Sequence, residues 1–272
     1  MKVLVVLVMT AGMAFMGNAS YGDVTTKDFL PVLEKVKAEV SSTLADIDQD
    51  LTQAAKTLAT IDRTGDAARD ILRGICKGRP YVYDCAVIDR NGKLSVVEPA
   101  SAREYEGRDI SFERQVKDAF ATKRPLLSKA FRCLDGSYRV DFEYPIVNDK
   151  GGLLGSVSLL VDHAALLREI VASSVTGQSY KVWAMETDGM VLYDQDRNQI
   201  NKNVFSDPLF APFKDLLSFC RKVAEQPSGE GQYEFYRKGL EDETIVKKDA
   251  VWDTVDFRGT QWRIVALEVV EQ

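Results

Sequence analysis

Apolar residues recur every three or four positions from Phe29 to Ile61. This spacing places them on one stripe of an amphipathic helix. Thr25 and Thr26 are suitable N-caps, and roughly 35 residues of helix measure about 50 Å. A rod of that length exceeds one small domain, so we expect it to run past two. A second, shorter helix is predicted from Asp66 to Cys76.

Two later stretches of the chain repeat one plan. In each, a β-rich run leads through a glycine-containing turn into a returning run, a pattern typical of a β-hairpin. Gly92 and Gly189 mark the two turns, and aligning them also pairs Tyr83 with Tyr180. A helix and further strands follow each hairpin. Both stretches therefore read β-β-α-β-β-β, which predicts a five-stranded antiparallel sheet with helices to one side.

Each stretch is expected to contain five strands and one helix. In the first stretch they are strands 82–88 and 93–97, helix 112–122, and strands 126–133, 138–147 and 153–161. In the second they are strands 180–185 and 191–193, helix 212–225, and strands 231–236, 244–255 and 262–269. A helix over 164–174 links the two stretches.

The predicted fold class is α+β, with a long N-terminal helix followed by two similar domains. We expect the boundaries to fall as follows: signal peptide 1–19, the long helix and the short helix 24–78, first domain 79–163, linking helix 164–177 and second domain 178–270. A chain of 272 residues is long enough for two ordinary domains.

The first residues have the features of a targeting segment. Lys2 supplies a positive start, and Val3–Phe15 is almost entirely apolar. This stretch is shorter than the roughly 20 residues that span a bilayer, and small residues ending at Ala19 suit a signal peptidase. We therefore expect cleavage before Ser20 and a periplasmic or secreted protein with no membrane span after cleavage. The alternative is an uncleaved N-terminal anchor.

Export would place the four cysteines in an oxidising compartment. Three complete pairings are open. Cys76, Cys85 and Cys133 fall within or next to the first domain, so we expect a single bridge among them. Cys220 lies on a predicted helix of the second domain and is expected to be a buried free thiol. None has the CxxC spacing of a redox or zinc site, so we expect no metal site.

The composition narrows the class of partner. The chain has 35 Lys and Arg against 41 Asp and Glu, a net charge of −6. A nucleic-acid partner would require a clustered basic surface, so none is expected. An apolar content of 45% with 28% charged residues is typical of a globular protein.

Several short motifs occur in a characteristic order. They are VIDRNGK at 87–93, GRDIS at 107–111, YPIV at 144–147, GSV at 155–157, the hairpin at 185–193 and NKN at 201–203. Together they resemble tandem Cache domains, the PAS-like extracytoplasmic sensor modules of bacterial chemoreceptors and sensor kinases, over residues 25 to 270. The resemblance implies two PAS-like domains and a small metabolite bound in the first, membrane-distal one.

Two features depart from this family. Many members have an arginine two residues after the serine of the pocket helix, where this chain has Glu113. Amino-acid recognition in the manner of the best-known subfamily is therefore not expected. The sequence also stops at Gln272 with no kinase or signalling coiled coil behind the second domain. We accordingly expect a stand-alone secreted form that signals through a separate membrane receptor or sensor kinase.

Candidate ligand contacts lie on the strand over 138–144, where apolar and polar positions alternate. A strand with one buried face explains this pattern without any ligand. Alternatively, Tyr138 or Tyr144 lines a pocket with its ring and hydroxyl. Asp141 points to the opposite face from these tyrosines, and it can bind a ligand amine if that face is the pocket side.

Further candidates lie where a lid over the first sheet is expected. These are Tyr105, Ser111 and Arg114, and Arg132 is added because a guanidinium can pair with a ligand carboxylate. For each arginine, a solvated surface charge is the simpler interpretation. In the second domain, Trp183, Tyr193 and Asp194 occupy the equivalent of a pocket, although a tryptophan on a strand is commonly a core residue.

No catalytic motif is found. His163 is the only histidine, and no nucleophile or carboxylate motif accompanies it. We therefore predict no catalytic residues, no cofactor and no enzymatic activity. The leading hypothesis is a sensor for a small organic ligand, a carboxylate or an amine. The alternatives are an interaction or scaffold protein of the cell envelope and, third, a hydrolase.

Overall fold

The computed structural model of this protein describes residues 29–175, 180–239 and 242–270. The predicted signal peptide and the predicted N-caps of the long helix lie outside these residues. None of the helices in the described part of the chain combines the length and the hydropathy of a membrane span.

The long helix α1 (Leu30–Leu58) forms as predicted but ends three residues earlier than the apolar pattern suggested. Its end is fixed locally, because Arg63 donates to the carbonyl oxygen of Leu58 and the side chain of Asp62 accepts from the backbone N–H of Thr64. These contacts compete with another helical turn. The buried residues of α1 follow the predicted stripe: Val32, Leu33, Val36, Val40, Leu44, Ile47, Leu51, Ala54 and Leu58.

The first sheet is antiparallel, with strand order β2-β1-β6-β5-β3 and with β4 also paired to β5. Its strands are β1 (Val82–Asp89), β2 (Leu94–Glu98), β3 (Leu126–Leu127), β4 (Phe131–Arg132), β5 (Tyr138–Val147) and β6 (Leu153–Val161).

This sheet has six strands where five were expected, because the predicted strand 126–133 is split in two. The split has a structural cause. Between β3 and β4 the backbone N–H of Ala130 donates to Glu186 of the second sheet, and Lys129 pairs with Asp188 at 2.6 Å. The ladder along β5 is interrupted where the chain makes these contacts.

The second sheet is antiparallel with five strands in the order β8-β7-β11-β10-β9. Its strands are β7 (Lys181–Glu186), β8 (Val191–Tyr193), β9 (Gly229–Tyr236), β10 (Ile245–Phe257) and β11 (Thr260–Val269). Counted along the chain, each sheet places its second strand at one edge, followed by the first, the last, the next-to-last and the third. The two sheets therefore share one topology.

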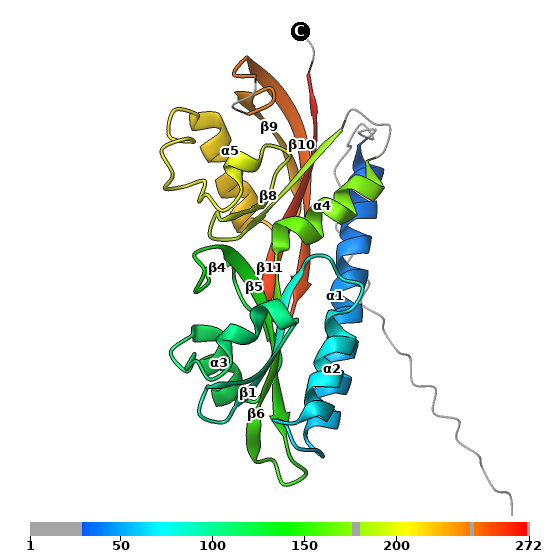
Figure 1. The fold of residues 1–272 in the computed structure, drawn as a ribbon. Coiled ribbons are helices and arrows are strands. Elements are labelled where there is room, and N and C mark those ends of the chain that lie inside the picture. Colours follow the sequence, from blue (N-terminus) through cyan, green and yellow to red (C-terminus); the bar gives the residue numbers. More distant parts are fainter. Residues whose placement is uncertain (1–28, 176–179, 240–241, 271–272) are drawn as a thin grey trace, which may run out of the picture.

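The helices divide between the two faces of the sheets (Figure 1). Both sheets lie along α1, which is joined on that side by α2 and α4, whereas α3 and α5 lie on the opposite side. The helices after α1 are α2 (Asp66–Cys76), α3 (Arg114–Thr122), α4 (His163–Ser174) and α5 (Lys214–Glu225), with 3₁₀ helices η1 (Ala100–Tyr105) and η2 (Arg197–Gln199).

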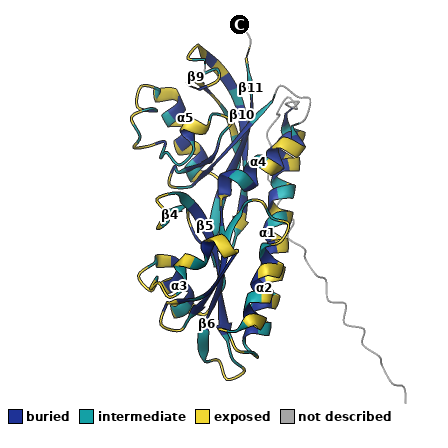
Figure 2. Cartoon of the chain, viewed as in Figure 1, coloured by how far each residue is buried: buried dark blue, intermediate teal, exposed yellow. Residues whose placement is uncertain are grey.

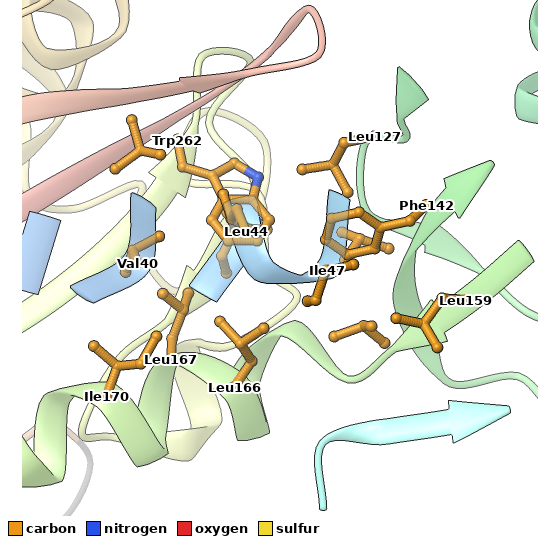
Figure 3. Close-up of a cluster of buried hydrophobic side chains, with 14 of the residues drawn as sticks. Val40, Leu44, Ile47, Leu127, Phe142, Leu159, Leu166, Leu167, Ile170 and Trp262 are labelled. Atoms are coloured by element: carbon orange, nitrogen blue, oxygen red, sulfur yellow. The ribbon is translucent and has the colours of Figure 1, made fainter. Parts of the chain in front are cut away.

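One hydrophobic core connects α1 to both sheets. Figure 3 shows Leu44 and Ile47 of α1 between Trp262 of the second sheet and Phe142 of the first, with α4 side chains alongside. In Figure 2 the strands are mostly buried (dark blue), whereas the outer surfaces of the helices are exposed (yellow). Because both sheets pack against this helix, a displacement of α1 would alter the packing of both.

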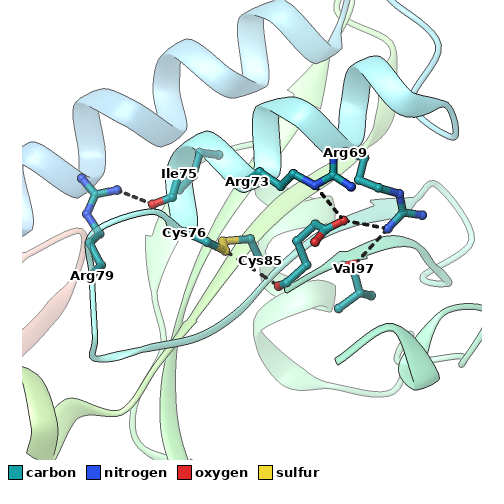
Figure 4. The surroundings of a disulfide bond; sticks show 8 residues. Arg69, Arg73, Ile75, Cys76, Arg79, Cys85 and Val97 are labelled. Carbon is teal, nitrogen blue, oxygen red and sulfur yellow. Dashed lines mark hydrogen bonds and ion pairs between the residues drawn. A yellow bond between two sulfur atoms is a disulfide. The ribbon is translucent and has the colours of Figure 1, made fainter. Parts of the chain in front are cut away.

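A disulfide between Cys76 and Cys85 joins the end of α2 to β1 (Figure 4). The expected single bridge is thereby confirmed, and its two partners are now assigned. The other two cysteines are free: Cys220 is buried, as predicted, and Cys133 is half-buried.

Candidate functional site

Each sheet has a cavity on the face turned away from α1, beneath the segment that covers it. The first cavity lies between strands β1, β5 and β6 and the η1–α3 segment and has a volume of about 80 Å³. The second cavity lies between strands β7, β8, β10 and β11 and the α5 side and has a volume of about 310 Å³. Both sites thus follow from the shared topology.

Alternation along β5 supplies the floor of the first cavity. Val140, Phe142 and Tyr144 face α1 and belong to the common core. Asp141 faces the other way and lines the first cavity. The strand was expected to bury one face, but both are buried, because the η1–α3 segment covers the polar side.

Asp141 is 3% exposed. The Ser158 hydroxyl donates to its Oδ1 at 2.6 Å. Burial is the main reason that the pKa of Asp141 is raised to about 6.

Asp84 of β1 lines the same cavity and makes no hydrogen bond or ion pair with another described residue. Burial, followed by the charge of Asp141, raises the pKa of Asp84 to about 7. Both carboxyl groups therefore ionise close to neutral pH, and a cation between them would stabilise their charged forms.

The nearby positive charge is already matched. The Arg139 guanidinium stacks 3.5 Å from the ring centroid of Tyr83 and pairs with Asp135 at 2.9 Å. The charge of Arg139 lowers the pKa of Asp84, but by less than burial and the charge of Asp141 raise it. The first cavity therefore keeps an excess of negative charge when Asp84 and Asp141 are ionised.

Glu143 lies behind this cavity, two residues further along β5. It is fully buried, and neither of its carboxyl oxygens has a hydrogen-bond partner among the residues that the structure describes. Burial and the charge of Asp141 raise the pKa of Glu143 well above its ordinary value. Burial and the neighbouring charge of Asp141 therefore favour the protonated, uncharged form of Glu143.

The seven predicted contact residues are not brought together. Tyr105 and Asp141 line the first cavity. Tyr144 lies on the α1 side, where its hydroxyl donates to Asp48, and Tyr138 alternates with it on the same side of β5. The face of β5 that carries the tyrosines is thus the helix face, which the alternation alone could not establish.

The remaining three residues lie at the surface. The side chain of Arg114, the first residue of α3, is 91% exposed and pairs with Asp118 at 3.4 Å. Arg132 is exposed and donates to the carbonyl oxygen of Gly136 within its own hairpin. Ser111 is exposed beside the turn at Gly92. None of the three lines either cavity.

Trp183 and Asp194 line the second cavity, whereas Tyr193 belongs to the core beside α1. Two lysines that the sequence analysis did not single out join them, Lys181 and Lys248. Lys181 donates to the carbonyl oxygen of Arg237 at 2.5 Å. Burial is the main reason that the pKa of Asp194 is raised to about 6 and that of Lys248 lowered to about 8.

The alternation of apolar residues contained a signal for two of the missed residues. Asp84 occupies the same face of its strand as Ala86 and Ile88. Lys248 occurs in register with Ala250 and Trp252, which are core positions. A charged residue at an inward position of an alternating strand indicates a lined cavity or a buried partner.

Within the described residues, no cluster of three or more His, Cys, Asp or Glu side chains is arranged to hold a metal ion.

Residues 42–163 match the model of the HK/GC/chemotaxis protein-like sensor domain. None of the curated proteins matches the sequence.

Several solved structures share the fold. An extracellular ligand-binding receptor from Desulfohalobium retbaense DSM5692 is 27% identical with a TM-score of 0.72, over 87% of this chain and 39% of that one. This chain thus spans about two fifths of that receptor.

The ligand-binding domain of the Pseudomonas aeruginosa PAO1 amino acid chemoreceptor PctB, in complex with L-Gln, is 15% identical with a TM-score of 0.62, over 89% of this chain and 90% of that one. The periplasmic sensory domain of the Campylobacter jejuni chemoreceptor Tlp1 is 13% identical with a TM-score of 0.62, over 87% and 92% of the two chains. With the family match, these structures confirm the predicted resemblance to the Cache-type extracytoplasmic sensor domains of chemoreceptors and histidine kinases.

Proposed function

We propose that this chain is the ligand-binding part of an extracytoplasmic sensor and that the first cavity takes the ammonium group of a small organic amine. The observation that carries the proposal is the pair Asp84 and Asp141, one half-buried and one buried carboxyl group that line one cavity, with no lysine or arginine among its described lining residues. A bound ammonium would offset the cost of burying these charges.

The size and walls of the cavity fit a ligand that enters with its amine first. A volume of about 80 Å³ is that of a head group rather than of a whole drug-sized molecule. Phe131 and Leu134 also line the cavity, and Leu134 is 50% exposed. An apolar part of the ligand would contact these side chains, while Tyr105 would cover the ammonium.

Binding would be read by a partner. A ligand that favours one arrangement of the η1–α3 segment shifts the population of that arrangement. The helix α1 packs against both sheets and would transmit the shift to a separate membrane receptor or sensor kinase. In this proposal the chain binds its ligand without turnover and acts outside the cytoplasm.

A thermal-shift experiment tests the proposal with matched probes. Propylamine, butylamine and benzylamine are compared with propionate, butyrate and benzoate at the same concentrations. A ligand at a hundred times its Kd stabilises by about 2.7 kcal/mol, which is roughly 5 to 10 °C for a chain of this size.

The matched variants are Asp141→Asn in the first cavity and Asp149→Asn in the exposed β5–β6 turn. We expect an amine shift that Asp141→Asn removes and Asp149→Asn retains. A folded protein that responds to none of the amines would contradict the amine site. A protein flat to every probe would favour the interaction or scaffold protein as the alternative function.

A further inference from the structure

Lys248 is a buried cation of the second cavity. It is 6% exposed on β10, and its ammonium lies 5.8 Å from the Tyr233 ring centroid and 5.2 Å from that of Phe235. It makes no hydrogen bond or ion pair with another residue in the part of the chain that the structure describes. An unpaired ammonium at such depth is costly, so a partner for it is expected from outside the chain.

The charges facing Lys248 do not balance. Lys181 of β7 and Asp194 at the end of β8 line the same cavity. Asp194 favours the charged form of Lys248, whereas Lys181 opposes it. Arg237 and Lys238 add positive charge to the lining of this cavity, and Asp196 adds negative charge. Four cationic side chains thus line the cavity with two carboxylates, which leaves an excess of positive charge for an anion to neutralise.

The second cavity has an apolar wall beside polar residues such as Gln195, Gln199 and Arg237. Its volume of about 310 Å³ is at the lower end of the range for small-molecule sites. The wall side chains are Trp183, Val204, Phe210, Leu216, Tyr233 and Leu267. A ligand of this cavity therefore needs an apolar body as well as its charge.

We propose that the second cavity is a separate binding site for a small monocarboxylate with an apolar tail. Lys248 and Lys181 bind the carboxylate, and the aromatic and aliphatic wall holds the tail. The site does not depend on the amine site proposed above, because the two cavities belong to different sheets.

Isothermal titration calorimetry of the full chain with butyrate and benzoate tests this site. Lys248→Met removes the charge and keeps an unbranched apolar side chain, and Lys247→Met makes the same change at the exposed neighbouring position. We expect Lys248→Met to weaken both carboxylates at least tenfold and Lys247→Met to leave both unchanged. Without ligand, Lys248→Met should melt at a higher temperature than the wild type, because a buried unpaired charge is gone.

Proton uptake provides a second readout. Burial holds the pKa of Lys248 at about 8, and a bound carboxylate favours its charged form. At pH 8, binding of benzoate should therefore take up a fraction of a proton, measured as a dependence of the binding enthalpy on the ionisation enthalpy of the buffer. The uptake should persist in Lys247→Met and be absent from Lys248→Met.

Three results would overturn the carboxylate site. The first is unchanged benzoate affinity in Lys248→Met. The second is a response to inorganic phosphate or sulfate equal to that of benzoate, since the apolar wall would then contribute nothing. The third is no binding of either carboxylate by the folded wild type. Loss of amine binding alone would contradict the amine site of the first cavity but not the carboxylate site.

Discussion

The two cavities lie at equivalent places in sheets of the same strand order, but their buried charges differ in sign. The first cavity is lined by Asp84 and Asp141 with no lysine or arginine among its described lining residues. In the second, the cations Lys181, Lys248, Arg237 and Lys238 outnumber Asp194 and Asp196. The topology determines where a cavity forms beneath the helical segment that covers each sheet, which we call its cap: the α3 side for the first cavity and the α5 side for the second. The side chains at a few inward strand positions then determine which ligand charge it can accept.

The caps also differ. On α5, Phe219 packs against Tyr233 at 4.7 Å and Trp252 at 5.3 Å between ring centroids. On α3, the buried apolar residues are only Val116 and Ala119. The cap of the second cavity is thus held by aromatic packing and that of the first by small aliphatic contacts.

Phe219→Ala should have the largest effect. Removing this ring leaves a cavity among the aromatic side chains, and we expect the free energy of unfolding to fall by about 3–5 kcal/mol. Val116→Ala, the matched truncation in the first cap, removes far less and should cost clearly less. Chemical denaturation of both variants measures the difference. Equal losses would show that the two caps contribute alike.

Loss of the disulfide should have the next largest effect on stability. The disulfide joins α2 to the first sheet, and the two cysteines outside it are free. Opening the nine-residue separation between Cys76 and Cys85 by Cys76→Ser should cost about 2–3 kcal/mol by the chain-entropy relation. Reductant should lower the stability of the wild type by a similar amount and leave the variant unaffected. Cys133→Ser, a free cysteine of the same region, is the control. A wild type indifferent to reductant would contradict the prediction.

The smallest effect concerns pH. Burial is the main reason that the pKa of Asp84 is raised to about 7. The charges of Asp141 and Asp135 also raise it, whereas Arg139 lowers it. The stabilisation by its protonated form is complete below about pH 4 and is lost as pH rises through about 7. Because Asp84 is only half-buried, we expect this loss, which Asp84→Asn should remove, to be on the order of 1 kcal/mol.

The measurement is the difference between wild type and Asp84→Asn in denaturation from pH 4 to 8. His163 acts in the opposite direction, because burial lowers its pKa to about 4, but it is common to both proteins and cancels in the difference. A difference that does not change across this range would contradict the burial of Asp84.

Much of the fold was predictable from local pattern. The bounds of α2, β5, β6 and β8 agree with the sequence prediction to the residue, because alternation or helical spacing ends there at glycine or polar turns. The split between β3 and β4 was not predictable. It depends on the contact of Ala130 with Glu186, 56 residues further along the chain.

The sites were harder to predict for a related reason. Alternation correctly separates Asp141 from Tyr144 on β5, but which face meets the long helix is decided only by packing. Arg114 follows the pocket motif in sequence, yet its position on α3 points it to solvent. Lys248 was not singled out, although it shares the inward register of Ala250 and Trp252 on β10.

The most direct test of opposite ligand preference is calorimetry with butylamine and butyrate, two probes of similar size and opposite charge, on the wild type and on Asp141→Asn and Lys248→Met. We expect Asp141→Asn to lose butylamine and keep butyrate, and Lys248→Met to lose butyrate and keep butylamine. If either variant loses both probes while remaining folded, or if each retains both, the two cavities are not separate sites of opposite preference.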